Sequence, residues 1–301
     1  MKARVILLLG VLGVSFSAIF VKYASAPSIT LAFYRMLFVT ILLLPAALLR
    51  NRGELSRLKA KDALMCAASG FFLACHFSCY FESIRQTSVA SSTVLVDTEV
   101  FFVAVFSFLL FREKSTAMGY LGMVITFLGS VLLALADSSG GSGSLYGDLL
   151  ALAGALFVSI YTMLGARIRR NLSTTVYTLL AYGTACVTLL CFSLISSAGI
   201  TGYGGMNWLL GFLLAVVCTL GGHSVFNWCL KYLPTALVSD AKLGEPVFAT
   251  VLTALLFGQI PTLMQLIGMA IVISGILLYL NCSKNTENTG SVRKSPHEND
   301  A

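Results

Sequence analysis

The sequence predicts an all-α membrane protein with ten transmembrane helices, built as two inverted five-helix repeats. Three observations lead to this class. The 301 residues are 57% apolar and only 11% charged, whereas soluble domains carry roughly 25% charged residues. The apolar residues fall into ten runs, each about 20 residues long, the length that spans a bilayer. Finally, the second half of the chain repeats the first. This composition excludes a soluble enzyme, a nucleic-acid-binding domain and a disordered scaffold.

Turn-forming or charged residues separate the ten apolar runs, as at Ala26-Pro27 and Leu233-Pro234. The runs lie at residues 5–24, 28–49, 63–84, 88–111, 116–136, 146–166, 174–197, 207–230, 235–257 and 262–281. After Cys282 the chain becomes polar, which predicts a disordered cytoplasmic tail over residues 283–301.

The first run has a second interpretation. Lys2 and Arg4 precede an apolar stretch that ends in Ala24-Ser25-Ala26, a pattern that also occurs in cleavable signal peptides. The stretch before Lys22 is about 17 residues long, which exceeds the usual hydrophobic region of a signal peptide. No long hydrophilic domain follows it. We therefore expect a retained span.

The basic residues predict the orientation in the membrane. If ten spans are threaded from a cytoplasmic N-terminus, 16 of the 20 Lys and Arg residues fall on the cytoplasmic side. Only Lys22 and Arg85 fall outside, and Arg35 and Lys242 lie within spans. The positive-inside rule then places both termini in the cytoplasm, with the chain in the cell membrane.

Neither the net charge nor the cysteines indicate a cofactor. The net charge of +7 comes from short loops between apolar runs, so we expect no nucleic-acid partner. Most of the eight cysteines lie inside apolar runs, and no C-x-x-C motif occurs. We therefore expect no metal and no other cofactor. The expected partners are the lipid bilayer, a small-molecule substrate and protons, with the chain a monomer or a homodimer.

The internal repeat appears when the sequence is shifted by 146 residues. Residues 99–132 then overlay residues 245–278 without a gap. The shared residues include Glu99 with Glu245, Gly122 with Gly268 and Gly129 with Gly275. A shared acidic residue with glycines at matching spacing is much less likely to arise by chance than shared apolar residues.

These matches divide the chain into a first repeat over 1–137, a Ser/Gly linker over 138–145 and a second repeat over 146–282. Each repeat has an odd number of spans, so the two must insert upside-down relative to each other. Inverted repeats recur in secondary transporters, with the substrate site between the repeats near the midplane.

The repeat motif also resembles a known family. Each half carries a version of the same motif, Glu245-Pro246-Val247-Phe248 in the second and Glu99-Val100-Phe101-Phe102 in the first, followed by spaced glycines. This pattern is similar to the ten-helix members of the EamA-type drug/metabolite transporter superfamily, and the likeness extends to about residue 282. The resemblance implies movement of small metabolites, commonly amino acids or amines, without ATP. The sequence has no G-x-x-x-x-G-K-[ST] phosphate loop.

Ionisable residues inside spans are costly, and they are candidates for function by default. Glu99 and Glu245 lie near the middle of equivalent spans, where each is either a substrate or coupling group or a structural hydrogen-bond partner. Lys242, three residues from Glu245, is its expected partner on one helix face. Pro246 is expected to kink that helix beside the charges, either at the site or only for packing.

Three further charges belong to this hypothesis. Asp97 is two positions from Glu99, so on a continuous helix the two side chains point about 160° apart and cannot line one cavity equally. Arg35 either binds a substrate carboxylate or, as we favour, pairs with Asp97 or Glu99 as a structural lock. Asp240 is expected nearer the cytoplasmic edge, where it is either solvated or part of the site.

Several polar and aromatic residues in spans could line a site for an organic solute. They are His76, His223, Tyr80, Asn227 and Trp228. For each, packing or hydrogen bonding within the bundle is the alternative interpretation, and no second His lies at metal-binding spacing.

Together these features predict a secondary transporter that moves a small metabolite by alternating access, with protons coupled through Glu99 or Glu245. The alternative is an intramembrane enzyme that modifies lipids or prenyl groups. Such an enzyme needs paired acidic motifs, and Asp97-Thr98-Glu99 is the only close acidic pair within a span.

Overall fold

The computed structural model describes residues 2–87, 89–111, 116–137, 145–257 and 261–292, and every element in them is a helix. These helices form ten passes, five from each repeat, as predicted. The first five are α1 (Lys2–Val14) with α2 (Ser17–Tyr23), α3 (Ser28–Arg50), α5 (Ala60–Gln86), α6 (Val89–Asp97) with α7 (Glu99–Phe106) and the π-helix η1 (Ser107–Phe111), and α8 (Ala117–Asp137). The short helix α4 (Arg52–Ser56) lies between α3 and α5.

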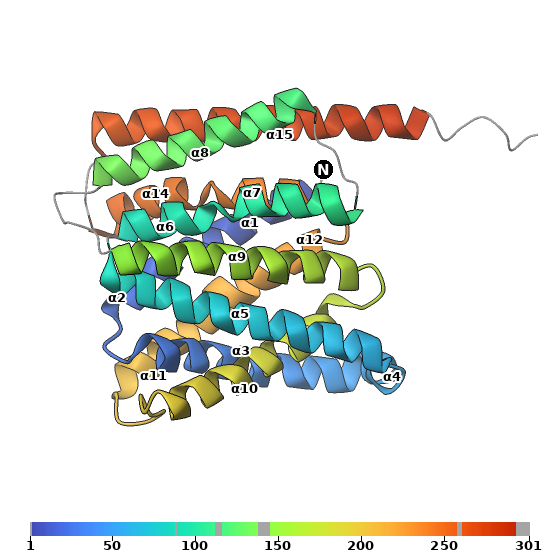
Figure 1. Cartoon of the computed structure of the whole chain (residues 1–301), viewed down its shortest axis with the longest axis vertical. Coiled ribbons are helices and arrows are strands. Elements are labelled where there is room, and N and C mark those ends of the chain that lie inside the picture. Colours follow the sequence, from blue (N-terminus) through green and yellow to red (C-terminus); the bar gives the residue numbers. More distant parts are fainter. Residues whose placement is uncertain (1, 88, 112–115, 138–144, 258–260, 293–301) are drawn as a thin grey trace, which may run out of the picture.

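The second repeat has the same order of passes. They are α9 (Leu145–Ile168), α10 (Thr174–Ile195), α11 (Gly205–Leu213) with the π-helix η2 (Leu214–His223) and α12 (Ser224–Cys229), α13 (Thr235–Lys242) with α14 (Glu245–Phe257), and α15 (Leu263–Val292). In Figure 1 the first repeat starts with α1 running from right to left, whereas the second starts with α9 running from left to right. The two repeats are therefore inverted relative to each other.

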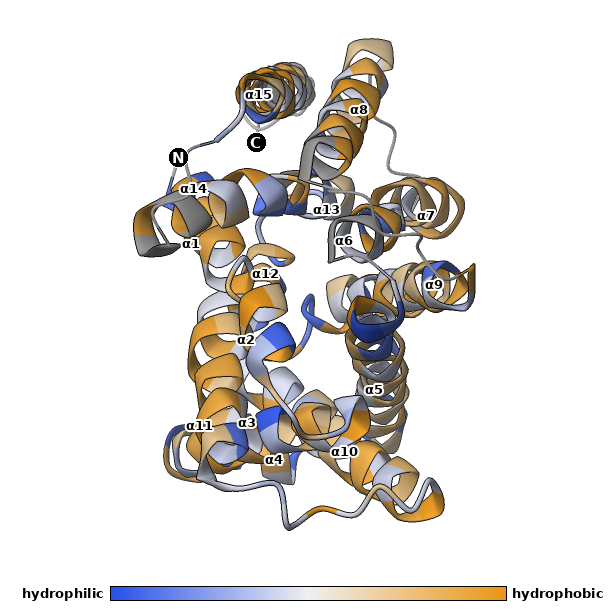
Figure 2. Cartoon of the chain, turned by 90° about the vertical axis from the view of Figure 1, so that its left-hand side faces the viewer, coloured by the Kyte–Doolittle hydropathy of each residue, from blue (hydrophilic) through white to orange (hydrophobic). Residues whose placement is uncertain are grey.

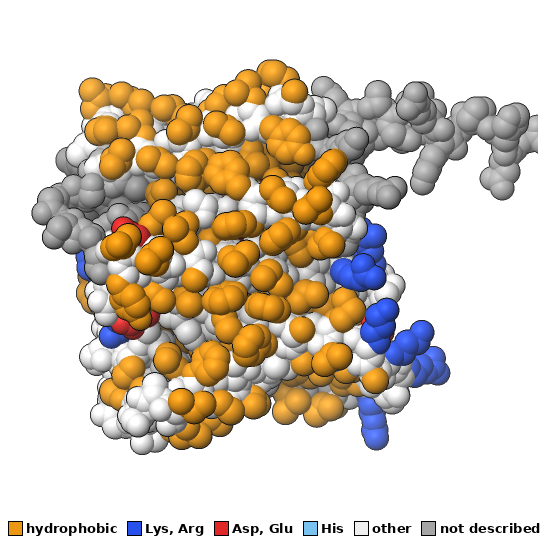
Figure 3. All heavy atoms as spheres, viewed as in Figure 1, with side chains coloured by type: hydrophobic (Ala, Val, Ile, Leu, Met, Phe, Trp, Pro, Cys, Tyr) orange, Lys and Arg blue, Asp and Glu red, His pale blue; other side chains and the backbone are white. Residues whose placement is uncertain are grey.

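The outer surface suits a bilayer. Seven helical stretches are long and apolar enough to cross a membrane, and two shorter apolar helices lie at residues 117–132 and 263–279. The remaining pass, α13 with α14, is divided near its centre. Figure 3 shows apolar side chains over the long face and Lys and Arg side chains gathered at one end. We call that end, where α3 and α9 end and α5 and α10 begin, the basic end.

The core lies between the repeats. Its largest cluster of buried side chains joins α3, α5, α9, α10, α11 and η2, with Tyr34, Phe77 and Tyr182 among its largest fully buried members. A second cluster joins α1, α12 and α13. In the end-on view of Figure 2, α8 and α15 form one edge of the bundle, and α3, α10 and α11 form the other.

The edge pair of α8 and α15 is held by glycines that match in the repeat. A Cβ atom on Gly275 would lie 2.6 Å from the backbone nitrogen of Thr126 and 2.8 Å from the carbonyl oxygen of Gly122. A Cβ on Gly129 would lie 2.8 Å from the backbone nitrogen of Val272. Small residues at these positions let the two backbones approach closely.

We expect Gly275→Ala to destabilise the protein by about 1–3 kcal/mol, because the new methyl group meets backbone atoms that cannot move aside. The measurement is thermal unfolding of the purified protein in detergent. Gly183→Ala is the matched control, since its Cβ would meet only a Thr40 methyl at 3.8 Å. Equal melting temperatures for the two variants would contradict the close packing of α8 on α15.

The predicted boundaries of the C-terminal tail and of the Ser/Gly linker compare differently with the structure. α15 continues to Val292 and so includes the first ten residues of the predicted disordered tail. The segment from Ser283 to Val292 contains no proline that would end the helix. A helix whose backbone ends are solvated can extend beyond the membrane. Most of the predicted linker, residues 138–144, and the end of the tail, residues 293–301, lie outside the described residues.

Candidate functional site

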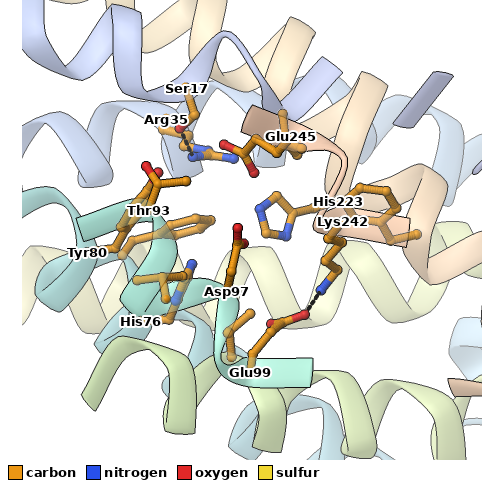
Figure 4. Close-up of a pocket in the computed structure, with 15 residues that line it drawn as sticks. Ser17, Arg35, His76, Tyr80, Thr93, Asp97, Glu99, His223, Lys242 and Glu245 are labelled. Carbon is orange, nitrogen blue, oxygen red and sulfur yellow. Dashed lines mark hydrogen bonds and ion pairs between the residues drawn. The ribbon is translucent and has the colours of Figure 1, made fainter. Parts of the chain in front are cut away.

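A cavity lies between the two repeats near the middle of the bundle (Figure 4). Its empty volume is about 510 Å³, including the solvent space at its edge. The first repeat contributes residues from α1, α2, α3, α5, α6 and α7, and the second contributes residues from α9, η2, α12, α13 and α14. The lining residues are Val14, Ser17, Arg35, His76, Phe77, Tyr80, Thr93, Val96, Asp97, Glu99, Val158, His223, Phe226, Lys242 and Glu245.

Two broken helices meet at this cavity, one from each repeat. α6 ends at Asp97 and α7 begins at Glu99, with a turn at Thr98 whose hydroxyl donates to the carbonyl of Leu95 over 2.6 Å. In the second repeat α13 ends at Lys242 and α14 begins at Glu245. The two glutamates thus occupy equivalent positions at helix N-termini, where the helix dipole favours a carboxylate.

The break at Thr98 corrects the prediction that Asp97 and Glu99 cannot line one cavity equally. The angle of about 160° applies only to a continuous helix. Because the helix restarts at Glu99, both side chains line the same cavity, and each is less than 7% exposed. The Oδ2 atom of Asp97 is buried and has no hydrogen-bond partner among the described residues.

The predicted pair of Lys242 with Glu245 is wrong. Lys242 Nζ instead lies 2.7 Å from Glu99 Oε1, so the ion pair joins α13 of the second repeat to α7 of the first. The reason is again a helix break: Leu243 and Gly244 lie between α13 and α14, so Lys242 and Glu245 are not on one helix face. The side chains of Lys242 and Glu99 are 12% and 5% exposed.

Pro246 does not kink a continuous helix, contrary to the prediction. It lies in the first turn of α14, where the missing N–H of proline would have no helical partner in any case. Gly244 before it ends the preceding segment, and its N–H donates to the carbonyl of Ala241 over 3.1 Å. Pro246 does not line the cavity, although Glu245 beside it does.

Arg35 is not the predicted lock, since no ion pair or hydrogen bond joins it to Asp97 or Glu99 within the described residues. Its Nε donates to Thr219 Oγ1 over 2.7 Å, and its guanidinium carbon lies 4.1 Å from the ring centroid of Phe77. The side chain is 1% exposed, and its Nη2 atom has no hydrogen-bond partner in the part of the chain that the structure describes. Figure 4 shows its guanidinium on the side of the cavity where Glu245 lies.

His76, His223 and Tyr80, which the sequence offers either as site residues or as packing residues of the bundle, all line the cavity. His76 Nδ1 donates to the carbonyl of Gly154 over 3.0 Å, which fixes its ring. The rings of His76 and His223 are 6.4 Å apart, and His76 stacks on Tyr80. Within the described residues no group of three or more His, Cys, Asp or Glu side chains is placed to hold a metal ion.

The structure places three other candidates outside the cavity. Asn227 hydrogen-bonds to Tyr161 and Tyr182, and the ring of Trp228 contacts that of Tyr232 at 4.6 Å, so neither lines the cavity as expected. Asp240 is 0% exposed rather than solvated, because α13 is buried over most of its length. Neither of its carboxylate oxygens has a hydrogen-bond partner in the described residues.

The sequence reasoning missed several residues of the site, among them the lining residues Ser17 and Phe77 and, outside the lining, Thr219, which accepts from Arg35. Nothing in the sequence around Ser17 marks it as a site residue, yet its Oγ accepts a hydrogen bond from Arg35 Nη1 over 3.4 Å (Figure 4). Thr219 lies in η2, where the π-helical turn lets its hydroxyl donate to the carbonyl of Leu214, five residues earlier. Phe77 could have been found from its place one residue after His76 on a polar stretch of α5.

Comparison with known proteins identifies the family. The sequence profile of the EamA-like transporter family matches residues 1–135 and again residues 145–281. The chain belongs to the EamA-like transporter family. The two matches cover both inverted repeats, so the chain is a multi-pass membrane transporter with two EamA repeats.

Similar proteins support this assignment. An "Uncharacterized transporter YxxF" of Bacillus subtilis is 27% identical over 87% of this chain and 84% of its own length. The "Inner membrane protein YtfF" of Escherichia coli is 25% identical over 89% of this chain and 91% of its own. A solved crystal structure with 21% identity superposes with a TM-score of 0.77, covering 95% of this chain and 99% of that one, which shows the same fold.

Proposed function

We propose that this EamA-family protein is a secondary transporter for a small metabolite that carries an amino group, such as an amino acid, an amine or a related solute. It carries the solute across the cytoplasmic membrane by alternating access and couples the movement to protons. The proposal depends above all on one observation. The cavity between the repeats holds a buried cationic group and a buried carboxylate, each with an unused hydrogen-bonding atom.

The charges of the cavity support an amino-group-bearing solute. Lys242 and Glu99 neutralise each other's charge. The remaining charged groups of the cavity are the Arg35 guanidinium and the carboxyl groups of Asp97 and Glu245. Arg35 Nη2 is free to donate to a solute carboxylate, and Asp97 Oδ2 is free to accept from a solute ammonium. The aromatic rings of Phe77, Tyr80 and Phe226 supply apolar wall around these groups. With one carboxylate in excess over cations, the empty cavity takes up a proton, and the arriving ammonium displaces it.

The architecture supports alternating access. Two inverted repeats enclose the cavity, and a broken helix of each repeat reaches it, an arrangement typical of carriers that expose one site alternately to the two sides. The basic end in Figure 3 supports a cytoplasmic location for both termini, because Lys and Arg are retained on that side.

We expect Asp97→Asn to abolish the response of transport to a pH gradient. The measurement is uptake of a panel of labelled amino acids and amines into proteoliposomes, with and without the gradient. In the wild type the gradient accelerates uptake of at least one solute, whereas in Asp97→Asn the ratio of the two initial rates falls to about one, because the amide takes up no proton.

Asp62→Asn is the control for that experiment, since Asp62 lies in the first turn of α5 outside the cavity. It should keep the wild-type response. Failure of the wild type to move any solute of the panel would contradict the proposed function itself. A gradient response that persists in Asp97→Asn and in Glu245→Gln would remove proton coupling from these carboxylates.

A further inference from the structure

A cluster of hydroxyl and amide groups lies directly beside the cavity and is not part of its lining. We call it the tyrosine cluster. Its members come from α5, α9, α10 and α12. They are Ser69, Tyr161, Tyr177, Tyr182, Ser224 and Asn227. The three tyrosines and Asn227 are at most 3% exposed, so no solvent passage reaches them.

Asn227 is the centre of the cluster. Its Nδ2 atom donates to the hydroxyl of Tyr161 over 2.5 Å and to the hydroxyl of Tyr182 over 3.3 Å. The Tyr182 hydroxyl lies 3.1 Å from Ser224 Oγ. Arg169, which directly follows α9, also holds this segment, since its Nε donates to the backbone carbonyl of Asn227 over 3.0 Å. One short helix, α12, is thereby tied to α9 and α10.

The cluster lies between the cavity and the basic end. The ring of Tyr161 is 6.3 Å from that of His223, which lines the cavity. Asn227 follows His223 by four residues and precedes the end of α12 by two. Tyr177 is three residues after the start of α10, at the basic end. The cluster therefore lies on the route from the cavity toward the basic end that runs between α9, α10 and α12.

The contacts that hold α12 against α9 and α10 can be broken without unfolding a helix. α12 makes its main contacts with α1 and η2, and fewer with α9 and α10. Its ties to Tyr161 and Tyr182 join one side chain to another, so they can separate without loss of any helical backbone bond. The preceding element, η2, is π-helical over ten residues and includes Gly221 and Gly222, and such segments often occur at functional sites.

We propose that the tyrosine cluster is the gate that closes the cavity toward the basic end, and that it opens when α12 moves away from α9 and α10. Asn227, Tyr161 and Tyr182 are then the residues that hold the closed state. This inference rests on the proposed transport function. It assigns to Asn227 a role in gating, in place of the role in lining the cavity that the sequence suggested.

The opposite end of the bundle is held differently. There Asn207 Oδ1 accepts from the backbone N–H groups of Ser25 and Ala26, each over 2.9 Å. The hydroxyl of Tyr34 donates to the backbone carbonyl of Ile200 over 2.7 Å. These bonds fasten loops to helices. Tyr34 is fully buried like the cluster tyrosines, and it provides a matched control far from the gate.

The test measures access of water-soluble thiol reagents to the gate in the full-length protein in lipid nanodiscs. Ser69→Cys places a thiol in the cluster, and site-resolved mass spectrometry follows its alkylation by a small maleimide. Cys218, buried in η2, is a native reference within the same molecule. The reporter is combined with Tyr161→Phe, with Asn227→Leu, or with the control Tyr34→Phe.

We expect Tyr161→Phe and Asn227→Leu each to raise the alkylation rate at position 69 by about fivefold or more, which corresponds to the loss of one buried hydrogen bond from the closed state. Cys218 should keep its rate, and Tyr34→Phe should change neither rate. The two gate variants check each other, so a folding failure of one leaves the other to decide.

Two results would overturn the gate. One is an unchanged rate at position 69 in both gate variants. The other is an equal rise at position 69 and at Cys218, which would mean that the cluster only stabilises the fold. The outcome is independent of the transport panel: a selective rise at position 69 in a protein that moves no solute supports the gate and contradicts the proposed transport function.

Discussion

Lys242→Met is expected to lower the free energy of unfolding by about 3–5 kcal/mol, the cost of leaving a buried charge without its partner. Glu99 is 5% exposed, and Lys242 is its partner at 2.7 Å. The pair joins the two repeats at the cavity, so its loss removes a contact between them as well as a charge. The measurement is thermal unfolding in detergent, combined with the yield of monodisperse protein.

The matched control for this prediction is the double variant Lys242→Met with Glu99→Gln. It removes both charges, so no unpaired carboxylate remains, and we expect it to recover most of the lost stability. A single variant as stable as the wild type would contradict the ion pair. A double variant no more stable than the single one would mean that Lys242 acts through packing instead.

Arg35→Lys is expected to reduce uptake of solutes that carry a carboxylate by about 10-fold to 100-fold, expressed as kcat/KM. A hydrogen bond between charged groups contributes about 1.5–3 kcal/mol, and lysine lacks the planar fork that holds a carboxylate. Arg35 is already positioned by Thr219 and by the ring of Phe77, with Nη2 left for the solute. The measurement is uptake into proteoliposomes at several solute concentrations.

The control for Arg35→Lys is the solute itself. An amine that lacks the carboxylate makes no bond to Arg35, so its uptake should change much less than that of the parent amino acid. A similar loss for both solutes would mean that Arg35 supports the fold of the cavity and does not recognise a carboxylate.

Much of the architecture could be predicted from the sequence, because apolar runs and a repeated motif report directly on membrane spans. The match of Glu99 with Glu245 placed both carboxylates in one central cavity, and the structure brings them there. His76, His223 and Tyr80 could be proposed as lining residues because each lies in a polar stretch of a span. The partners of the charges could not be predicted in the same way.

The errors about Asp97, Lys242 and Pro246 share one cause, which is the assumption that each span is a continuous helix. The helix restarts at Glu99, which brings Asp97 into the same cavity, and the break after Lys242 directs that side chain to the other repeat. Gly244 with Pro246 two residues later was a usable signal, since glycine commonly ends a helix and proline commonly starts one. The break at Thr98 has no such signal. The tyrosine cluster depends on contacts between distant helices, which spacing along one helix does not report.

The most direct test of the transport mechanism is counterflow in proteoliposomes, with the solute that the uptake panel identifies. Vesicles are preloaded with unlabelled solute, and the initial uptake of labelled solute is measured against its external concentration. A carrier that alternates access to one cavity predicts saturable uptake that the internal solute accelerates. Uptake that rises linearly with concentration and does not respond to internal solute would contradict the account.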